Sequence, residues 1–309
     1  MKTLSIRSLL LPVVALALAG VQARAQAPAA AAPPDYSKVE IKIHKVSDNF
    51  STLEGMGGTI GVLTGPEGVF MVDTQFPQLS QKIAAAIKTI SPLPIRFIVN
   101  THVHPDHTGG DENFARMGAT IFAREELRDR LAHPATSLTG AVIPASPAIA
   151  LPIVTYRGPV TLHMDGEIVD LIPIVAHTDG DTLVYFRNND VLMTGDAYRA
   201  ISYPFVDKAS GGSVEGMIDA QGMMIGLCGP NTKVVPGHGP TVDRTAIMAM
   251  RDMLLAVQAK VAAMLKQGMT LEQVVASHPT AEYDAKFDTN RAPADRLVGA
   301  IYGELKAAQ

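Results

Sequence analysis

Short apolar runs and longer amphipathic stretches alternate along the chain, and they predict strands and helices in turn. The strand-like runs are rich in β-branched residues and lie at 39–46, 59–64, 69–73, 95–100, 160–162, 168–175, 183–186, 191–194 and 233–235. The helix-like stretches lie at 79–90, 214–227, about 241–267, 271–276 and 291–305, and in the first of them Ile83, Ile87 and Ile90 share one face. Strand and helix material occurs in two successive sets. The pattern therefore predicts an α/β protein in which two sheets pack together with helices outside.

Three segments break this alternation. Residues 1–25 have a basic start, an apolar stretch and a small-residue cleavage site, which is the layout of a secretory signal peptide. The apolar stretch is shorter than the ~20 residues that a membrane-spanning helix needs, so we expect export without stable membrane insertion, to the periplasm or the medium. Residues 26–35 form an Ala/Pro-rich tract that predicts a disordered linker. A third segment, 131–157, contains four prolines and lacks a clean period, which favours a lid or an irregular excursion.

Composition narrows the functional classes. Apolar residues make up 47% of the 309-residue chain, so most of it can bury a core. The formal charge is −4, and removal of the leader would take away only basic residues, which argues against nucleic acid as a partner. The single cysteine, Cys228, excludes an internal disulfide, and we expect it to be a packed residue within a helix. The chemistry therefore has to come from His, Asp, Glu and the backbone, acting on a small molecule.

A dense cluster of candidate ligands follows the predicted strand 95–100. His102, His104, Asp106 and His107 lie within six residues, in a segment where Pro105 and the following glycines prevent a simple continuation of the strand. Imidazole nitrogens and carboxylate oxygens are suitable zinc ligands, and irregular backbone lets neighbouring side chains converge. This spacing predicts a metal site.

Three more candidates each follow a strand-like run: His177, Asp196 and His238. Together the candidates number seven, whereas one tetrahedral zinc takes four ligands. The set therefore indicates two metal ions that share a bridging carboxylate and a bridging water.

The order His-x-His-x-Asp-His, a later His, a Gly-Asp and a Gly-His-Gly resembles the metallo-β-lactamase-fold hydrolases, from about residue 39 to 305. The resemblance implies an αββα sandwich of two mixed sheets with helices outside, over a domain 36–309. It also implies that His102, His104 and His177 hold the first metal. Asp106, His107 and His238 would hold the second, and Asp196 would bridge the two. Asp73 matches the family's early aspartate, which supports the ligand loop from outside the ligand set.

By this resemblance the protein is a di-zinc hydrolase, in which a metal-bound hydroxide attacks a carbonyl and Asp106 orients the water and moves a proton. The expected substrate is a lactone, ester or amide. A β-lactam stays open, although the relatives that cleave β-lactams commonly carry Cys or Ser where Asp196 stands. Tyr198, Arg199 and Tyr203 follow Asp196 closely and are candidates to contact substrate.

Two other activities of the same fold stay open. A mononuclear iron dioxygenase uses a His/His/Asp subset that is present here, and a thioesterase of the glyoxalase II type would share the whole ligand set. The ligand types admit iron or manganese as well as zinc. A metal-binding protein without catalysis is the remaining alternative, and the intact ligand set disfavours it.

Overall fold

The computed structural model describes residues 34–136, 140–287 and 291–309. The predicted signal peptide lies outside these residues, as does most of the predicted linker. Contacts within the chain divide it between Asp35 and Tyr36, and the fold described below is that of the Tyr36–Gln309 unit. In the three described ranges, no helix is both long enough and apolar enough to cross a membrane.

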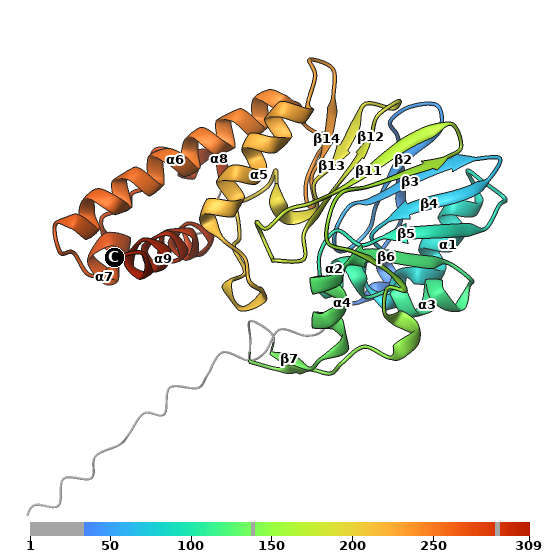
Figure 1. Cartoon of the computed structure of the whole chain (residues 1–309), viewed down its shortest axis with the longest axis horizontal. Helices are drawn as coiled ribbons and strands as arrows, with labels where there is room; N and C mark the ends of the chain where they lie inside the picture. Colours follow the sequence, from blue (N-terminus) through green and yellow to red (C-terminus); the bar gives the residue numbers. More distant parts are fainter. Residues whose placement is uncertain (1–33, 137–139, 288–290) are drawn as a thin grey trace, which may run out of the picture. The chain divides into compact units, whose positions relative to one another are not determined.

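Two mixed sheets form the centre of this unit (Figure 1). The first has the strand order β1 (Lys42–Lys45), β2 (Phe50–Glu54), β3 (Ile60–Gly65), β4 (Gly68–Val72), β5 (Ile95–Val99), β6 (Thr120–Arg124), β9 (Val154–Tyr156). The second has the order β10 (Val160–Met164), β11 (Glu167–Pro173), β12 (Thr182–Phe186), β13 (Val191–Met193), β14 (Lys233–Val235). The pairs from β4 to β9 and the pair β13–β14 are parallel, and the other pairs of these two sheets are antiparallel. A short hairpin, β7 (Ala135–Thr136) and β8 (Val142–Ile143), stands apart from both.

Strand β4 shows why its segment is apolar without alternation. All five of its residues are buried, because the strand has a packed layer on each face. Phe70 and Val72 belong to the core between the two sheets. Val69 and Met71 belong to a second core that contains helix α1. A strand buried on both faces is expected in the parallel part of a sheet that is covered by helices.

Helices flank both sheets. They are α1 (Ser80–Lys88), α2 (Pro105–Thr108), α3 (Asp111–Arg116), α4 (Glu125–Ala132), α5 (Val214–Leu227), α6 (Arg244–Lys266), α7 (Leu271–Ala276), α8 (Asp284–Phe287) and α9 (Ala292–Ala307). Helices α1 and α3 pack on the first sheet, whereas α5, α6 and α9 pack beside the second sheet in a third core (Figure 1). The expected αββα sandwich is therefore confirmed.

Several details differ from the sequence-based expectation. Strands β2 and β6 and helices α3 and α4 were not expected, because each is short and contains polar residues. The expectation that Cys228 lies within a helix was wrong. It is the residue after the last turn of α5, in extended backbone, although its side chain is buried as expected.

Candidate metal centre

The carboxyl ends of five strands meet at one edge of the sandwich. Asp73 follows β4, and the segment from His102 to His107 follows β5 in the first sheet. His177, Asp196 and His238 follow β11, β13 and β14 in the second sheet. Because β4 and β5 are parallel, as are β13 and β14, the chain leaves each pair at the same edge. Residues far apart in the sequence are thereby brought into one cluster.

Three histidines form the first group of this cluster. The ligand atoms of His102, His104 and His177 lie within 4.8 Å of one another. The closest pair is His177 Nε2 and His104 Nδ1, at 2.9 Å. His104 is therefore oriented with Nδ1 toward the group, while its Nε2 points to Asp207. Three converging imidazole nitrogens are a typical zinc ligand set.

The second group joins Asp106, His107 and His238, whose ligand atoms also lie within 4.8 Å of one another. Asp106 Oδ2 is 3.2 Å from His238 Nε2. Asp196 lies between the two groups. Its Oδ1 is 3.4 Å from His107 Nε2, and its Oδ2 is 3.8 Å from His177 Nε2. The structure thus brings all seven residues together, with Asp196 in a position to bridge.

Burial keeps two of the candidate ligand histidines in the neutral form. Burial, reinforced by neighbouring histidines, holds the pKa of His102 well below its usual value. Burial also lowers the pKa of His177 to about 4. Both imidazoles are therefore neutral near pH 7 and can act as ligands. His102 Nε2 is buried and accepts no hydrogen bond from any described residue, which leaves a free lone pair aimed into the cluster.

The carboxylates of the cluster are held in the charged form. Burial alone would raise the pKa of Asp106, but the hydrogen bond to His238 and the nearby His107 lower it to about 2. The pKa of Asp196 also lies well below its usual value, because hydrogen bonds to His107 and His238 outweigh burial. Buried carboxylates require compensating positive charge, and metal cations would supply it here.

Partners outside the ligand set fix the histidine rings. Asp73, in a left-handed conformation with φ of 62°, accepts hydrogen bonds from Thr101 N and from His107 Nδ1, each at 2.7 Å. The carbonyl oxygen of Phe205 accepts from His177 Nδ1, also at 2.7 Å. Such partners select the tautomer and set the direction of the other ring nitrogen. Asp73 therefore occupies the supporting position that the resemblance implied.

Asp207 is a supporting residue that the sequence did not reveal. Its Oδ2 accepts from His104 Nε2 at 2.9 Å, and its Oδ1 accepts from the backbone of Ala209 and Ser210 at the start of the 3₁₀ helix η5 (Lys208–Ser210). Although burial opposes it, the His104 hydrogen bond keeps the pKa of Asp207 well below the usual range. An Asp before a short helix signals a cap, but not a contact with a histidine 103 residues earlier.

Glycines let the backbone approach the cluster. A Cβ atom on Gly58 would lie 2.0 Å from the ring of His107. A Cβ atom on Gly237 would lie 2.1 Å from Asp196 Oδ1. Gly237, directly before His238, is therefore required for the close contact between the end of β14 and Asp196.

A cavity of about 780 Å³ opens onto the cluster, and His104, Asp106, Asp196 and His238 lie in its wall. This volume suits a small organic ligand. Apolar side chains from the proline-rich excursion and from the loop after Asp196 form another part of the wall: Leu131, Pro134, Ile143, Pro144, Pro147 and Phe205. Arg130, Arg199 and Arg296 add cationic groups.

Of the three residues expected to contact substrate, one lines the cavity and two do not. Arg199 lines the cavity, with its Nη1 3.7 Å from Asp196 Oδ2. Tyr198 and Tyr203 do not line it, because both are buried in the core with the C-terminal helices. The hydroxyl of Tyr203 donates to Asp284 at 2.7 Å. The expectation for the two tyrosines is corrected on this point, since apolar burial of the rings outweighs their nearness to Asp196 in sequence.

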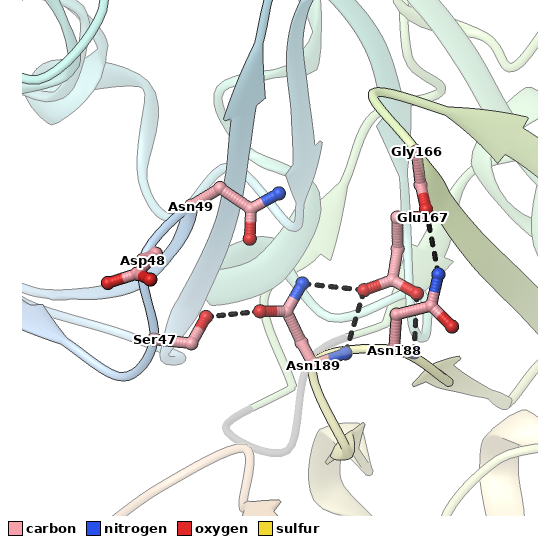
Figure 2. A pocket seen from close by; sticks show the side chains of 7 residues that line it. All are labelled: Ser47, Asp48, Asn49, Gly166, Glu167, Asn188 and Asn189. Carbon is pink, nitrogen blue, oxygen red and sulfur yellow. Dashed lines mark hydrogen bonds between the residues drawn. The ribbon is translucent and has the colours of Figure 1, made fainter.

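A second, smaller hollow of about 340 Å³ lies at the turns after β1, before β11 and after β12 (Figure 2). It contains none of the seven candidate ligands. The buried Glu167 accepts hydrogen bonds from the backbone of Asn188 and Asn189 and from the Asn189 side chain, and Ser47 donates to Asn189. These bonds tie the three turns together, so this hollow is a structural junction.

Comparisons with known proteins show the family to which this chain belongs. The metallo-beta-lactamase superfamily model matches residues 53–257, and the chain belongs to that superfamily. It is similar to the linear primary-alkylsulfatase of Pseudomonas sp. (strain ATCC 19151), with 23% identity over 257 residues, 69% of this chain and 48% of the relative. It is also similar to the 2,4-dinitroanisole O-demethylase subunit alpha of Nocardioides sp. (strain JS1661), with 28% identity over 158 residues, 48% of this chain and 45% of the relative. The chain spans about half the length of these curated relatives.

Solved structures show the same fold. The sec-alkylsulfatase Pisa1 from Pseudomonas sp. superposes with a TM-score of 0.68 and 14% identity, over 85% of this chain and 50% of its own. A metallo-beta-lactamase from Pontibacter korlensis superposes with a TM-score of 0.59 and 20% identity, over 70% of this chain and 99% of its own. Members of this fold generally bind metal ions, and the His/Asp cluster of this chain could hold metal.

Proposed function

We propose that the protein is a hydrolase that holds two zinc ions and cleaves a carbonyl substrate, a lactone, ester or amide. The observation that carries the proposal is the placement of Asp196, with one carboxylate oxygen near His107 and the other near His177. Each of the two groups around it supplies three further ligands. His102, His104 and His177 would hold one ion, and Asp106, His107 and His238 the other.

When bound, the two ions supply Lewis acidity, which polarises a carbonyl oxygen and lowers the pKa of water to about 7. The chain's own residues do the positioning. Asp207, Asp73 and the carbonyl of Phe205 hold three of the imidazoles by their outer nitrogens, so that the inner nitrogens stay fixed when substrate binds.

Asp106 is partly exposed and lies in the cavity wall, as His104 and His238 also do. Its carboxylate is charged near neutral pH and can accept a hydrogen bond from a water in the cavity. Arg199 lies in the same wall and can donate to an oxygen that gains negative charge during attack. These two groups would orient the water and stabilise the developing oxyanion.

Turnover on a panel of a lactone, an aryl ester and a chromogenic β-lactam tests the proposal, with and without a chelator. His102→Ala is expected to lose zinc and turnover together, because it removes the buried unpartnered nitrogen. His163→Ala is the matched control, because His163 is an exposed residue on β10 outside the cluster. Full turnover by His102→Ala would contradict the metal-dependent mechanism.

Sulfate-ester hydrolysis is a second candidate. The match to a linear primary-alkylsulfatase favours it, as does Arg199 beside Asp196, since guanidinium groups bind sulfate oxygens well. Release of inorganic sulfate from a primary alkyl sulfate, followed by ion chromatography, separates this candidate from carbonyl hydrolysis. Chelator-sensitive sulfate release without lactone or ester turnover would replace the first candidate with the second.

A further inference from the structure

Helix α9 contributes a cation to the cavity that the ligand cluster does not account for. Arg296 is an exposed residue of α9 and lines the cavity. Its helix is fixed in the core by Leu297, Val298 and Ile301, which are all buried. The segment lies beyond residues 53–257, the part of the chain that the family model matches.

Arg296 has no carboxylate partner within the described ranges, which distinguishes it from the other arginines of the cavity. Arg130 forms two hydrogen bonds to Asp179, at 2.7 and 2.6 Å, and Arg199 lies close to Asp196. The acidic side chains of the cavity wall face other groups. Glu112 pairs with Arg116, Asp129 lies beside His133, and Asp207 holds His104. Arg296 is therefore a positive group that is available to a ligand.

The position of Arg296 relative to the cluster is defined by Phe205. The guanidinium carbon of Arg296 lies 5.3 Å from the centre of the Phe205 ring. That ring lies 5.4 Å from the His177 ring and 6.3 Å from the His104 ring, with the His104 ring nearly parallel to it. One aromatic ring thus separates the guanidinium from the ligand histidines. A ligand that spans this ring would contact the cluster at one end and Arg296 at the other.

We propose that Arg296 is a specificity-determining residue that binds an oxyanion, such as a carboxylate, at the end of the substrate remote from the cleaved bond. The inference rests on the proposed function for the identity of the cleaved bond. The preferred substrate then has three parts: a reactive ester, lactone or sulfate group at the cluster, an apolar middle against Phe205 and Leu131, and a terminal anion at Arg296. A guanidinium is suited to this role because it donates two parallel hydrogen bonds to a carboxylate.

Binding of simple carboxylates to the zinc-loaded protein, measured by calorimetry, tests the proposal directly. Straight-chain dicarboxylates of increasing length are compared with monocarboxylates of the same length. One carboxylate of either series can reach the cluster, but only a dicarboxylate of the right length also reaches Arg296. We expect one length at which the dicarboxylate binds about ten-fold more tightly than its monocarboxylate. Arg296→Gln is expected to remove this advantage and to leave monocarboxylate affinity unchanged.

Arg96→Gln is the matched control. Arg96 also lies over an aromatic ring, 4.9 Å from the centre of Phe97, but it does not line the cavity. This variant should keep the dicarboxylate advantage.

Two results would overturn the proposal. Equal affinities of the two series at every length would show that Arg296 binds no terminal anion. A loss of monocarboxylate affinity in Arg296→Gln would place the guanidinium at the cluster end of the ligand instead. Turnover of uncharged esters and of alkyl sulfates by the unmodified protein is measured separately. If the proposed function is wrong, the turnover measurement shows it. If Arg296 binds no terminal anion, the carboxylate affinities show it.

Discussion

Replacement of Asp207 by alanine is expected to weaken zinc binding more than it weakens the fold. The carboxylate has two separate roles, because one oxygen holds His104 Nε2 and the other caps the 3₁₀ helix η5. Loss of the hydrogen bond to a ligand histidine typically costs 10- to 100-fold in metal affinity, about 1.4 to 2.8 kcal/mol. Loss of a cap costs about 1 kcal/mol of stability. The loss of zinc-binding free energy should therefore be larger than the loss of unfolding free energy that removal of the cap causes.

The matched control is Asp243→Ala. Asp243 caps helix α6 by accepting from Ala246 N, and it contacts none of the seven candidate ligands. Zinc affinity is measured by titration against a competing chelator, and the free energy of unfolding of the metal-free protein by denaturant. Asp207→Asn keeps a single acceptor oxygen, so it should fall between wild type and alanine. Equal zinc affinities of the two alanine variants would refute the role assigned to Asp207.

Three further predictions test other parts of the structure. Tyr203→Phe removes the hydrogen bond to Asp284, so we expect unfolding free energy to fall by about 1 kcal/mol in denaturant titration, with turnover unchanged because the ring lies outside the cavity. Gly237→Ala places a Cβ atom against Asp196, so the purified variant should contain less metal while its circular dichroism stays unchanged; full metal content would contradict the close approach. Burial raises the pKa of the Cys228 thiol to about 11, so a thiol reagent at pH 8 should react about 100-fold more slowly with the native protein than with the unfolded one, and equal rates would mean that the thiol is accessible.

The candidate ligands could be found from the sequence because each stands directly after an apolar strand. His102, His104, Asp106 and His107 are also clustered in sequence, so their convergence needs little tertiary information. The sandwich was predictable for a similar reason, since strands such as β4 and helices such as α1 have clear apolar patterns.

The outer partners were not predictable in the same way. Asp207 meets His104 only because the loop after η4 (Gly195–Ala197) returns to the cavity, a tertiary event with no local signal. Arg296 reaches the cavity only because α9 packs beside the second sheet. Conversely, Tyr203 is near Asp196 in sequence, but its ring is buried with Phe287 among the C-terminal helices. A residue that is close in sequence to a candidate metal ligand therefore does not necessarily line the cavity.

The proposed metal centre would hold two ions, with Asp196 as the bridging ligand. The most direct measurement is the metal content of the purified protein by elemental analysis, for the wild type and for Asp196→Asn. We expect about two zinc ions per chain in the wild type and a loss of at least one in the variant, because the bridging carboxylate becomes a neutral amide. One iron per chain, or a zinc content that Asp196→Asn leaves unchanged, would contradict this proposal.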